Sequence, residues 1–383
     1  MLLKLVPVLA VLGVIGAAVP AAAVPVCTAA DVRAEEGAGC PSDQTMPCSL
    51  SKAYEVTANG CTFDFGTQAV TILGGGSRKF DVGGFQSVRI LAGSITMNAL
   101  SEIRAKGSGA NPNGGSITLR TTGDLTILNS SKIDATVIGA NVAGDITLEI
   151  GGNATIGGAL SADASSANGV AGEIVIEVDG NLVTTATISA KTSSGGASAG
   201  TVDIFTVGSM TIGGRVDVSG FDGGELVLDA GLDVIVDAVI DTDGIGDGGS
   251  GGPVTITSLR GIELRDEIQA RGNGGTEQIG GDGGAVNLDA QYGDILVDAN
   301  IFGEAGVPDG VGDEIVMLST GSITITQGSE ISTRANGGFG DGGTLDLTAE
   351  VDVDVRGDLD SSGGLGAGDL TIMAGRDASV AGS

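Results

Sequence analysis

The stretch GGDGGAVNLDAQYGDILVDANIFGEAG (residues 280–306) contains two pairs of apolar residues that alternate with polar ones, Val286/Leu288 and Ile295/Val297. Alternation with a period of two is typical of a β-strand that buries one face. Glycine and aspartate cluster at both ends of the stretch, where the chain has to turn. Similar text occurs at GDITLEIGGNATIGGALSADASS (144–166) and GGTLDLTAEVDVDVRGDLDSSGG (342–364), so the stretch is one unit of a repeat.

The repeat has a period near 28 residues when its units are aligned on the glycine that opens each of them. An apolar pair lies two and four residues after the opening glycine, with a slip of one residue in the unit of Gly312, and two further apolar pairs follow in most units. A loop rich in Gly, Ser, Asn and Asp then leads to the next unit. The opening glycines are Gly115, Gly144, Gly172, Gly200, Gly224, Gly252, Gly284, Gly312, Gly343 and Gly368.

Three short strands and a loop per unit predict one coil of a solenoid, which buries its apolar face only by stacking on its neighbours. We therefore predict an all-β fold, a right-handed single-stranded parallel β-helix. At about 4.8 Å per coil, roughly twelve coils would form a rod about 60 Å long. The opening glycines are expected at sharp corners that need a positive φ angle. A propeller would need four strands per unit, and a β-sandwich would not keep so constant a register.

The first 23 residues have the composition of a secretory signal peptide. They contain one lysine, a short apolar run and a small-residue exit, with cleavage expected after Ala23. The four cysteines that follow predict two disulfides, with three connectivities open, because their number is even and the chain is exported. They are Cys27, Cys40, Cys48 and Cys61. We expect residues 24–61 to form a cap and residues 62–383 to form the coils.

The two ends of the predicted rod differ. Leu50, Ala53 and Tyr54 have helical spacing and predict a short amphipathic helix over the first coil. After Gly368 the chain begins another coil and no cap is evident. An uncovered solenoid end exposes strand edges. We therefore expect fraying there, contact with another subunit or a larger assembly, or continuation in a longer product.

Composition excludes several classes of partner. The formal charge is −30, which repels nucleic acid and anionic membranes. No segment of the mature chain is apolar for long enough to insert into a membrane. The sequence contains no tryptophan and only two tyrosines, so no row of aromatic side chains for stacking on sugars is predicted.

The repeats GGSITL, GDLTI and KIDA (within 114–135) and GGAVNL and GDILVDANI (within 283–301) resemble those of filamentous-haemagglutinin-like bacterial surface proteins. The segment SLSKAYEVTANGCTF (49–63) is similar to the stretch that opens many pectate-lyase-like β-helices. The resemblance covers about residues 62–383 and is specific for architecture. It implies export, right-handed coiling, and a role in adhesion or surface structure.

The glycine-rich loops carry the only candidate metal ligands. Carboxylates on flexible loops suit Ca²⁺, although calcium-binding repeats use tandem nonapeptides, whereas here one acidic loop of variable length occurs per coil. Solvated Asp-Gly turns are the alternative. Calcium is the one cofactor that the sequence suggests. The candidate ligands are Asp241, Asp243, Asp247, Asp282, Asp309, Asp313 and Asp341.

No catalytic residues are assigned. With no histidine in the chain, a constellation of aspartates and a histidine is absent. A lyase would need an arginine base among carboxylates, and SLRGIELRDEIQARGNGG (258–275) is the one coil with concentrated charge. Its Arg260, Arg265 and Arg271 lie beside Glu263 and other acidic residues, so we expect them to point outward and form surface ion pairs.

We therefore expect an exported structural or adhesin-like protein at the bacterial cell surface, without catalytic activity of its own. Its partner would be an extracellular glycan or a surface protein, bound through many weak contacts along the rod. A polysaccharide-active enzyme is one alternative, which would require carboxylates and an arginine to converge on one face. A calcium-stabilised module of a larger exoprotein is the other.

Overall fold

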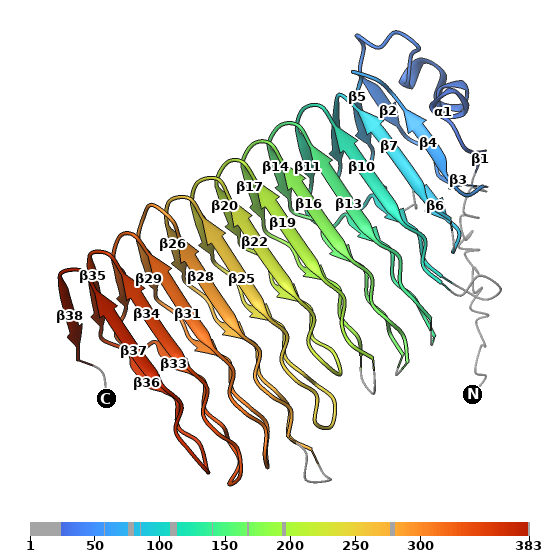
Figure 1. Ribbon diagram of the computed structural model, residues 1–383. Helices are drawn as coiled ribbons and strands as arrows, with labels where there is room; N and C mark the ends of the chain where they lie inside the picture. Colours follow the sequence, from blue (N-terminus) through green and yellow to red (C-terminus); the bar gives the residue numbers. More distant parts are fainter. Residues whose placement is uncertain are drawn as a thin grey trace, which may run out of the picture.

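The computed structural model describes residues 24–56, 58–75, 80–84, 86–107, 113–139, 141–166, 168–193, 197–275 and 280–381. The predicted signal peptide, 1–23, lies outside the described residues. The chain forms a parallel β-solenoid with about 28 residues per coil, as predicted. Each coil gives one strand to each of three long parallel sheets, A, B and C, which run the length of the rod (Figure 1).

Sheet A contains the third strand of each coil and is built from very short strands. Its inward residues are mostly isoleucine, as in the register Ile188–Val216–Ile240. In order, its strands are β1 (Val24–Val26), β3 (Tyr54–Val56), β6 (Phe80–Val82), β9 (Glu102–Arg104), β12 (Lys132–Asp134), β15 (Ala159–Ser161), β18 (Ile188–Ser189), β21 (Val216–Asp217), β24 (Ile240–Asp241), β27 (Ile268–Gln269), β30 (Ile301–Phe302), β33 (Glu330–Ser332) and β36 (Asp358–Asp360).

Sheet B contains the first strand of each coil and has the longest strands. Each of its central strands buries a third residue beyond the predicted apolar pair, often a small one such as Ser258 or Ser319. In order, its strands are β4 (Cys61–Asp64), β7 (Val88–Ala92), β10 (Ile117–Thr121), β13 (Ile146–Ile150), β16 (Ile174–Val178), β19 (Val202–Thr206), β22 (Leu226–Ala230), β25 (Val254–Ser258), β28 (Val286–Ala290), β31 (Ile315–Ser319), β34 (Leu345–Ala349) and β37 (Leu370–Ala374).

Sheet C contains the second strand of each coil. Its strands present one outward residue between two buried ones, as at Thr126 between Leu125 and Ile127. In order, its strands are β2 (Cys48–Leu50), β5 (Ala69–Ile72), β8 (Ser94–Met97), β11 (Leu125–Ile127), β14 (Ala154–Ile156), β17 (Leu182–Thr184), β20 (Met210–Ile212), β23 (Val234–Val236), β26 (Ile262–Leu264), β29 (Ile295–Val297), β32 (Ile323–Ile325), β35 (Asp352–Val355) and β38 (Asp377–Val380).

The core is one continuous aliphatic column between the three sheets. The predicted inward pairs stack on their counterparts in neighbouring coils, as in the register Ile176–Ile204–Leu228–Ile256. These side chains are almost fully buried. The column thins at the last coil, where Leu370, Met373 and Val380 are more than half exposed because no further coil follows them in the structure.

The opening glycines are required by close packing between coils, and the prediction of a positive φ angle for them is wrong. Among the described residues, the glycines with positive φ are others, such as Gly248 and Gly328. A β-carbon on Gly224 would lie 1.9 Å from the carbonyl oxygen of Gly200, one coil earlier. Asp313, rather than Gly312, takes this place in its coil, since the carbonyl oxygen of Asp313 is the one that a β-carbon on Gly343 would meet.

The opening residue also closes the loop that precedes it. The amide of Gly224 donates to the carbonyl of Val218 at 2.7 Å, and the amide of Gly252 donates to that of Thr242 at 2.7 Å. The loop between the third strand of one coil and the first strand of the next is therefore pinned at its base. These loops extend beyond the strands on one side of the rod (Figure 1).

The cap contains a helix, but at a different place from the one predicted. Leu50 ends strand β2 and Tyr54 begins strand β3, and both side chains lie in the core. The helix is α1 (Ala29–Glu36), followed by the 3₁₀ turn η1 (Gly37–Gly39). It begins with a capping box in which Thr28 and Asp31 bond each other's backbone amides, a local signal that the sequence already contains. No helix among the described residues is long and apolar enough to cross a membrane.

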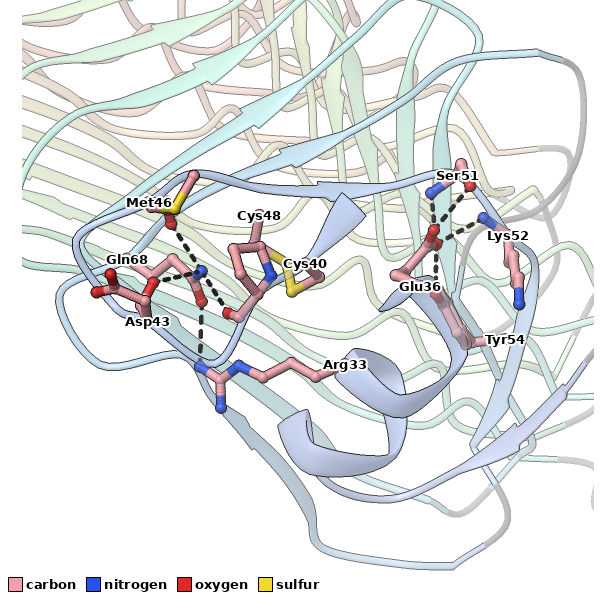
Figure 2. The surroundings of a disulfide bond; sticks show 11 residues. Arg33, Glu36, Cys40, Asp43, Met46, Cys48, Ser51, Lys52, Tyr54 and Gln68 are labelled. Atoms are coloured by element: carbon pink, nitrogen blue, oxygen red, sulfur yellow. Dashed lines mark hydrogen bonds between the residues drawn. A yellow bond between two sulfur atoms is a disulfide. The ribbon is translucent and has the colours of Figure 1, made fainter. Parts of the chain in front are cut away.

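Two disulfides hold the cap, and the structure selects one of the three connectivities: Cys27–Cys61 and Cys40–Cys48. Buried Gln68 adds a polar link, because its side-chain amide donates to the carbonyls of Pro41 (3.0 Å) and Met46 (2.7 Å) (Figure 2). Strands β1, β2 and β3 already belong to sheets A and C, so the sheets begin before the boundary expected at residue 62.

Candidate functional site

At least five of the seven predicted calcium ligands accept hydrogen bonds from backbone amides of the chain itself. Asp282 accepts a hydrogen bond from the amide of Val311 at 2.9 Å, and Asp309 accepts one from Gly280 at 2.7 Å. Each of these bonds joins neighbouring coils. Asp313 accepts from the amide that follows it in the chain, at 2.8 Å. These carboxylates therefore stabilise the stacked loops.

Asp241 accepts a hydrogen bond from the amide of Asp243 at 3.0 Å, and Asp243 accepts one from the amide of Arg271 in the next coil at 2.7 Å. Asp241 is buried and Asp243 half-buried at the end of strand β24, whereas Asp247 and Asp341 are exposed in two different loops. Among the described residues, no group of three or more His, Cys, Asp or Glu side chains could hold a metal ion. Calcium binding by these loops stays a prediction, to be tested on the protein in solution.

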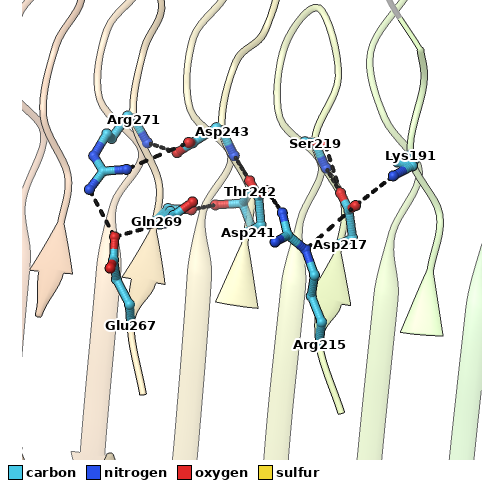
Figure 3. A network of polar contacts seen from close by, with 10 residues as sticks. All are labelled: Lys191, Arg215, Asp217, Ser219, Asp241, Thr242, Asp243, Glu267, Gln269 and Arg271. Atoms are coloured by element: carbon cyan, nitrogen blue, oxygen red, sulfur yellow. Dashed lines mark hydrogen bonds and ion pairs between the residues drawn. The ribbon is translucent and has the colours of Figure 1, made fainter. Parts of the chain in front are cut away.

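A row of alternating charges crosses successive coils beside sheet A (Figure 3). Lys191 Nζ lies 2.8 Å from Asp217 Oδ2, and Arg215 Nε lies 3.7 Å from the same oxygen. Arg215 also contacts Asp241 through Nη2. The aspartates are nearly buried while the basic side chains are partly exposed, so each buried carboxylate is paired with a charge that keeps contact with solvent.

The same row continues toward the C-terminus. Arg271 lies 2.9 Å from Glu267 and 3.7 Å from buried Glu304. Arg334 lies 3.1 Å from the other oxygen of Glu304 and 3.5 Å from Asp360. The row thus links third strands that are one coil apart, and pairing of this kind is what allows carboxylates to be buried at all.

The pKa values along this row diverge. Burial would raise the pKa of Asp217, but hydrogen bonds from Lys191 and Ser219 and the charge of Lys191 hold it below its usual value. Burial raises the pKa of Asp241 in spite of Arg215. Burial also raises the pKa of Asp243 to about 6, and the negative charge of Asp241 adds to this effect.

We expect Asp243→Asn to stabilise the protein at neutral pH. In the unfolded chain an aspartate has a pKa near 3.9, and folding raises the pKa of Asp243 to about 6. Below about pH 4 this carboxyl is protonated in both the folded and the unfolded chain, and it does not weaken the fold. As the pH rises through 6 it has to ionise in its buried site, which lowers the stability of the folded state. The free energy of unfolding of the variant should therefore exceed that of the wild type by about 2 to 3 kcal/mol at about pH 8, and the two should be equal at about pH 4.

Urea unfolding of both proteins at several pH values measures this difference. A gain that grows between about pH 4 and pH 8 is the expected result. A difference between the two proteins that is constant over the whole range would contradict the assignment, because it would come from a contact rather than from a proton.

The charged coil at 258–275 forms the expected surface ion pairs. Arg265 donates to both oxygens of Glu263, at 2.8 Å each, and to Asp237 at 3.0 Å. Arg271 lies over the ring of Phe302, with its guanidinium carbon 4.0 Å from the ring centre. Both arginine side chains are therefore held by neighbours within the protein, and neither guanidinium is free to act as the base of a lyase reaction.

An arginine and three carboxylates converge instead on a groove that the sequence analysis missed. The groove has a volume of about 380 Å³ and lies at the ends of strands β10, β13 and β16. Arg120 Nε lies 3.3 Å from Glu149 Oε2, and Glu177 pairs with Glu149 in register on the next coil. Asp179 completes the lining. Outward residues of strands in different coils meet here, and only the register reveals it.

A second shallow groove, of about 570 Å³, lies beside sheet C at strands β23, β26 and β29. Its lining includes Tyr292, which is the most exposed large apolar side chain among the described residues, at 78 %. The other tyrosine, Tyr54, is fully buried. The sequence pattern placed Tyr54 on an apolar face and gave no prediction for Tyr292, which lies in a turn between two strands.

Sheet C also carries a column of outward threonines. The register aligns Thr71, Thr96, Thr126 and Thr155 on four successive coils, and Val183 then interrupts the series. No hydroxyl of these four threonines has a hydrogen-bond partner within the described part of the chain. The signal was present in the sequence as the middle residue of each second strand.

Comparison with models of protein families, with curated protein sequences and with solved structures gives no match to this chain.

Proposed function

We propose that the chain is an exported, surface-associated rod with a structural or adhesive role and no catalytic activity of its own. The observation that carries this proposal is the threonine column of sheet C, in which unpaired hydroxyls repeat once per coil. Identical donors and acceptors at about 4.8 Å spacing offer many weak contacts in a line, and such contacts add up to strong retention on an extended partner.

Other features support export to a cell surface. Two disulfides persist most readily outside the reducing cytosol. The predicted signal peptide and the resemblance to filamentous-haemagglutinin-like repeats point the same way. The partner would be an extracellular glycan or a surface protein.

Co-sedimentation with whole cells and with insoluble polysaccharides tests the proposal. We expect the protein to be retained on at least one of them without any release of sugar into the supernatant. Replacing Thr96 and Thr126 by alanine should weaken retention, whereas the same change at Thr118 and Thr147, which face outward side by side on sheet B, serves as the matched control. If the protein is retained on none of these surfaces, the adhesive role is refuted.

The groove at Arg120 favours a second candidate function, cleavage of a polysaccharide. Arg120 and Glu149 form an ion pair next to Glu177, which is the convergence of an arginine and carboxylates that a lyase would need. The supernatant of the same assay separates the two functions. Release of unsaturated sugars by the wild type, abolished in Arg120→Ala, would establish the enzyme and displace the purely adhesive rod.

Calcium stabilisation is tested separately. If the loop aspartates bind Ca²⁺, the melting temperature should rise with added Ca²⁺ and fall again with a chelator, since a ligand that binds only the folded state stabilises it. An unchanged melting temperature would refute calcium stabilisation, and the role of these aspartates would then be the hydrogen bonds to backbone amides described above.

A further inference from the structure

The groove beside Tyr292 combines an exposed aromatic ring with an apolar floor and unsatisfied polar groups. Tyr292 lies in the turn between strands β28 and β29, and its side chain is 78 % exposed. The register of sheet C sets Ile235 and Leu296 on either side of Glu263, one coil away in each direction. Their aliphatic side chains face outward and line the groove.

The polar groups around this floor are only partly used by the protein. Arg260 is 66 % exposed, and its one described ion pair is a contact of 3.8 Å to Asp233. This distance is too long for a hydrogen bond, so the guanidinium keeps its donors available. Asp294 is held by the amide of Ser322 at 2.7 Å through one oxygen, which fixes the carboxylate and leaves the other oxygen available.

This set of groups matches the chemistry of a sugar ring. The C–H face of a pyranose packs on an aromatic side chain, while its hydroxyls take hydrogen bonds from an arginine and give them to a carboxylate. A volume of about 570 Å³ is within the range of small-molecule sites.

The charge of the groove restricts the class of ligand further. Arg260 is the one basic residue in the lining, against Asp233, Glu263 and Asp294, and the whole chain carries −30. An acidic polysaccharide would be repelled. We propose that the groove at Tyr292 is a binding subsite for an uncharged glycan, with the ring of Tyr292 as the stacking platform and Arg260 and Asp294 as its hydrogen-bonding partners. The inference rests on the proposed adhesive function and names its ligand.

The protein offers a direct reporter of this binding. It has no tryptophan, and Tyr54, the only other tyrosine, is fully buried and bonded to Glu36, so tyrosine fluorescence that changes with a ligand reports on Tyr292. We would screen the purified protein against an array of neutral and acidic glycans. Neutral glycans that bind would then be titrated in solution by fluorescence and by calorimetry.

Variants identify the site. Tyr292→Ala and Arg260→Ala should each weaken binding of the neutral glycan at least tenfold, and Tyr292→Phe, which keeps the ring, should change it less than threefold. Phe339→Ala removes another exposed aromatic side chain, 69 % exposed and outside the groove, and should leave binding unchanged. Circular dichroism of each variant checks that the solenoid is intact.

Three results would overturn the inference: no neutral glycan binds, acidic glycans bind more tightly, or Tyr292→Ala binds as well as the wild type. The co-sedimentation assay separates these failures from failure of the proposed function. Wild type and Tyr292→Ala retained equally on cells would reject the groove and keep the adhesive rod. Wild type retained on no surface would reject the adhesive rod itself.

Discussion

Gly224→Ala should lower the free energy of unfolding by about 3 kcal/mol, the upper part of the usual range for overpacking. A β-carbon at this position would lie 1.9 Å from the carbonyl oxygen of Gly200. That oxygen belongs to the backbone of the preceding coil, which is fixed by the five-residue pairing of β19 with β22. The clash cannot be relieved by a change of rotamer, so the two coils must separate locally.

Gly338→Ala is the matched control. A β-carbon on Gly338 would meet no atom within 4 Å, and the φ angle of Gly338 is not in the left-handed region. We expect this change to alter stability by less than about 0.5 kcal/mol, as for an ordinary surface substitution. Urea unfolding gives the free energies, and hydrogen exchange should show the lost protection in strands β19, β22 and β25. Equal losses in both variants would contradict the packing explanation.

Reduction of Cys27–Cys61 should cost more stability than reduction of Cys40–Cys48. The first disulfide joins residues 34 apart and the second residues 8 apart. Closing the longer loop removes more entropy from the unfolded chain, which corresponds to about 4 kcal/mol against about 2.5 kcal/mol. The free energy concerned is that of unfolding the first coils, since solenoids can open from one end.

Two variants isolate each disulfide. One keeps Cys27–Cys61 and carries alanine at positions 40 and 48, and the other keeps Cys40–Cys48 and carries alanine at positions 27 and 61. In each variant, reduction changes only the remaining cross-link. Hydrogen exchange of strands β2 to β5, before and after reduction, measures the loss. A larger loss on reducing the short loop would show that the disulfides act mainly through contacts in the folded cap.

The strands of the solenoid could be predicted because burial repeats with a period of two along the chain. Pairs such as Ile295/Val297 are apolar at positions where any polar group would be costly, and this constraint is visible in a single sequence. The cap was harder. Leu50 and Tyr54 are separated by a turn, so their helical spacing was accidental, and burial in two different strands produced it.

The surface could not be predicted in the same way. The convergence of Arg120 with Glu149 and the groove at Tyr292 depend on which residues of successive coils lie side by side. Outward positions tolerate many residue types, so their sequence carries little information about their neighbours. The loop aspartates are of the residue type that binds metal ions, yet at least five of them bond backbone amides, and composition does not distinguish the two roles.

The sequence by itself determined the architecture: a parallel solenoid with three strands per coil, an aliphatic core and a disulfide-bonded cap. Only the tertiary structure decided why the opening glycines are glycine, which cysteines pair, and which outward side chains share a groove. The physical reason is the range of the interactions. The alternation of buried and exposed positions depends on residues two positions apart in the sequence. Contacts such as that of Gly224 with Gly200 join residues about one coil apart, and their geometry is fixed only when the coils stack.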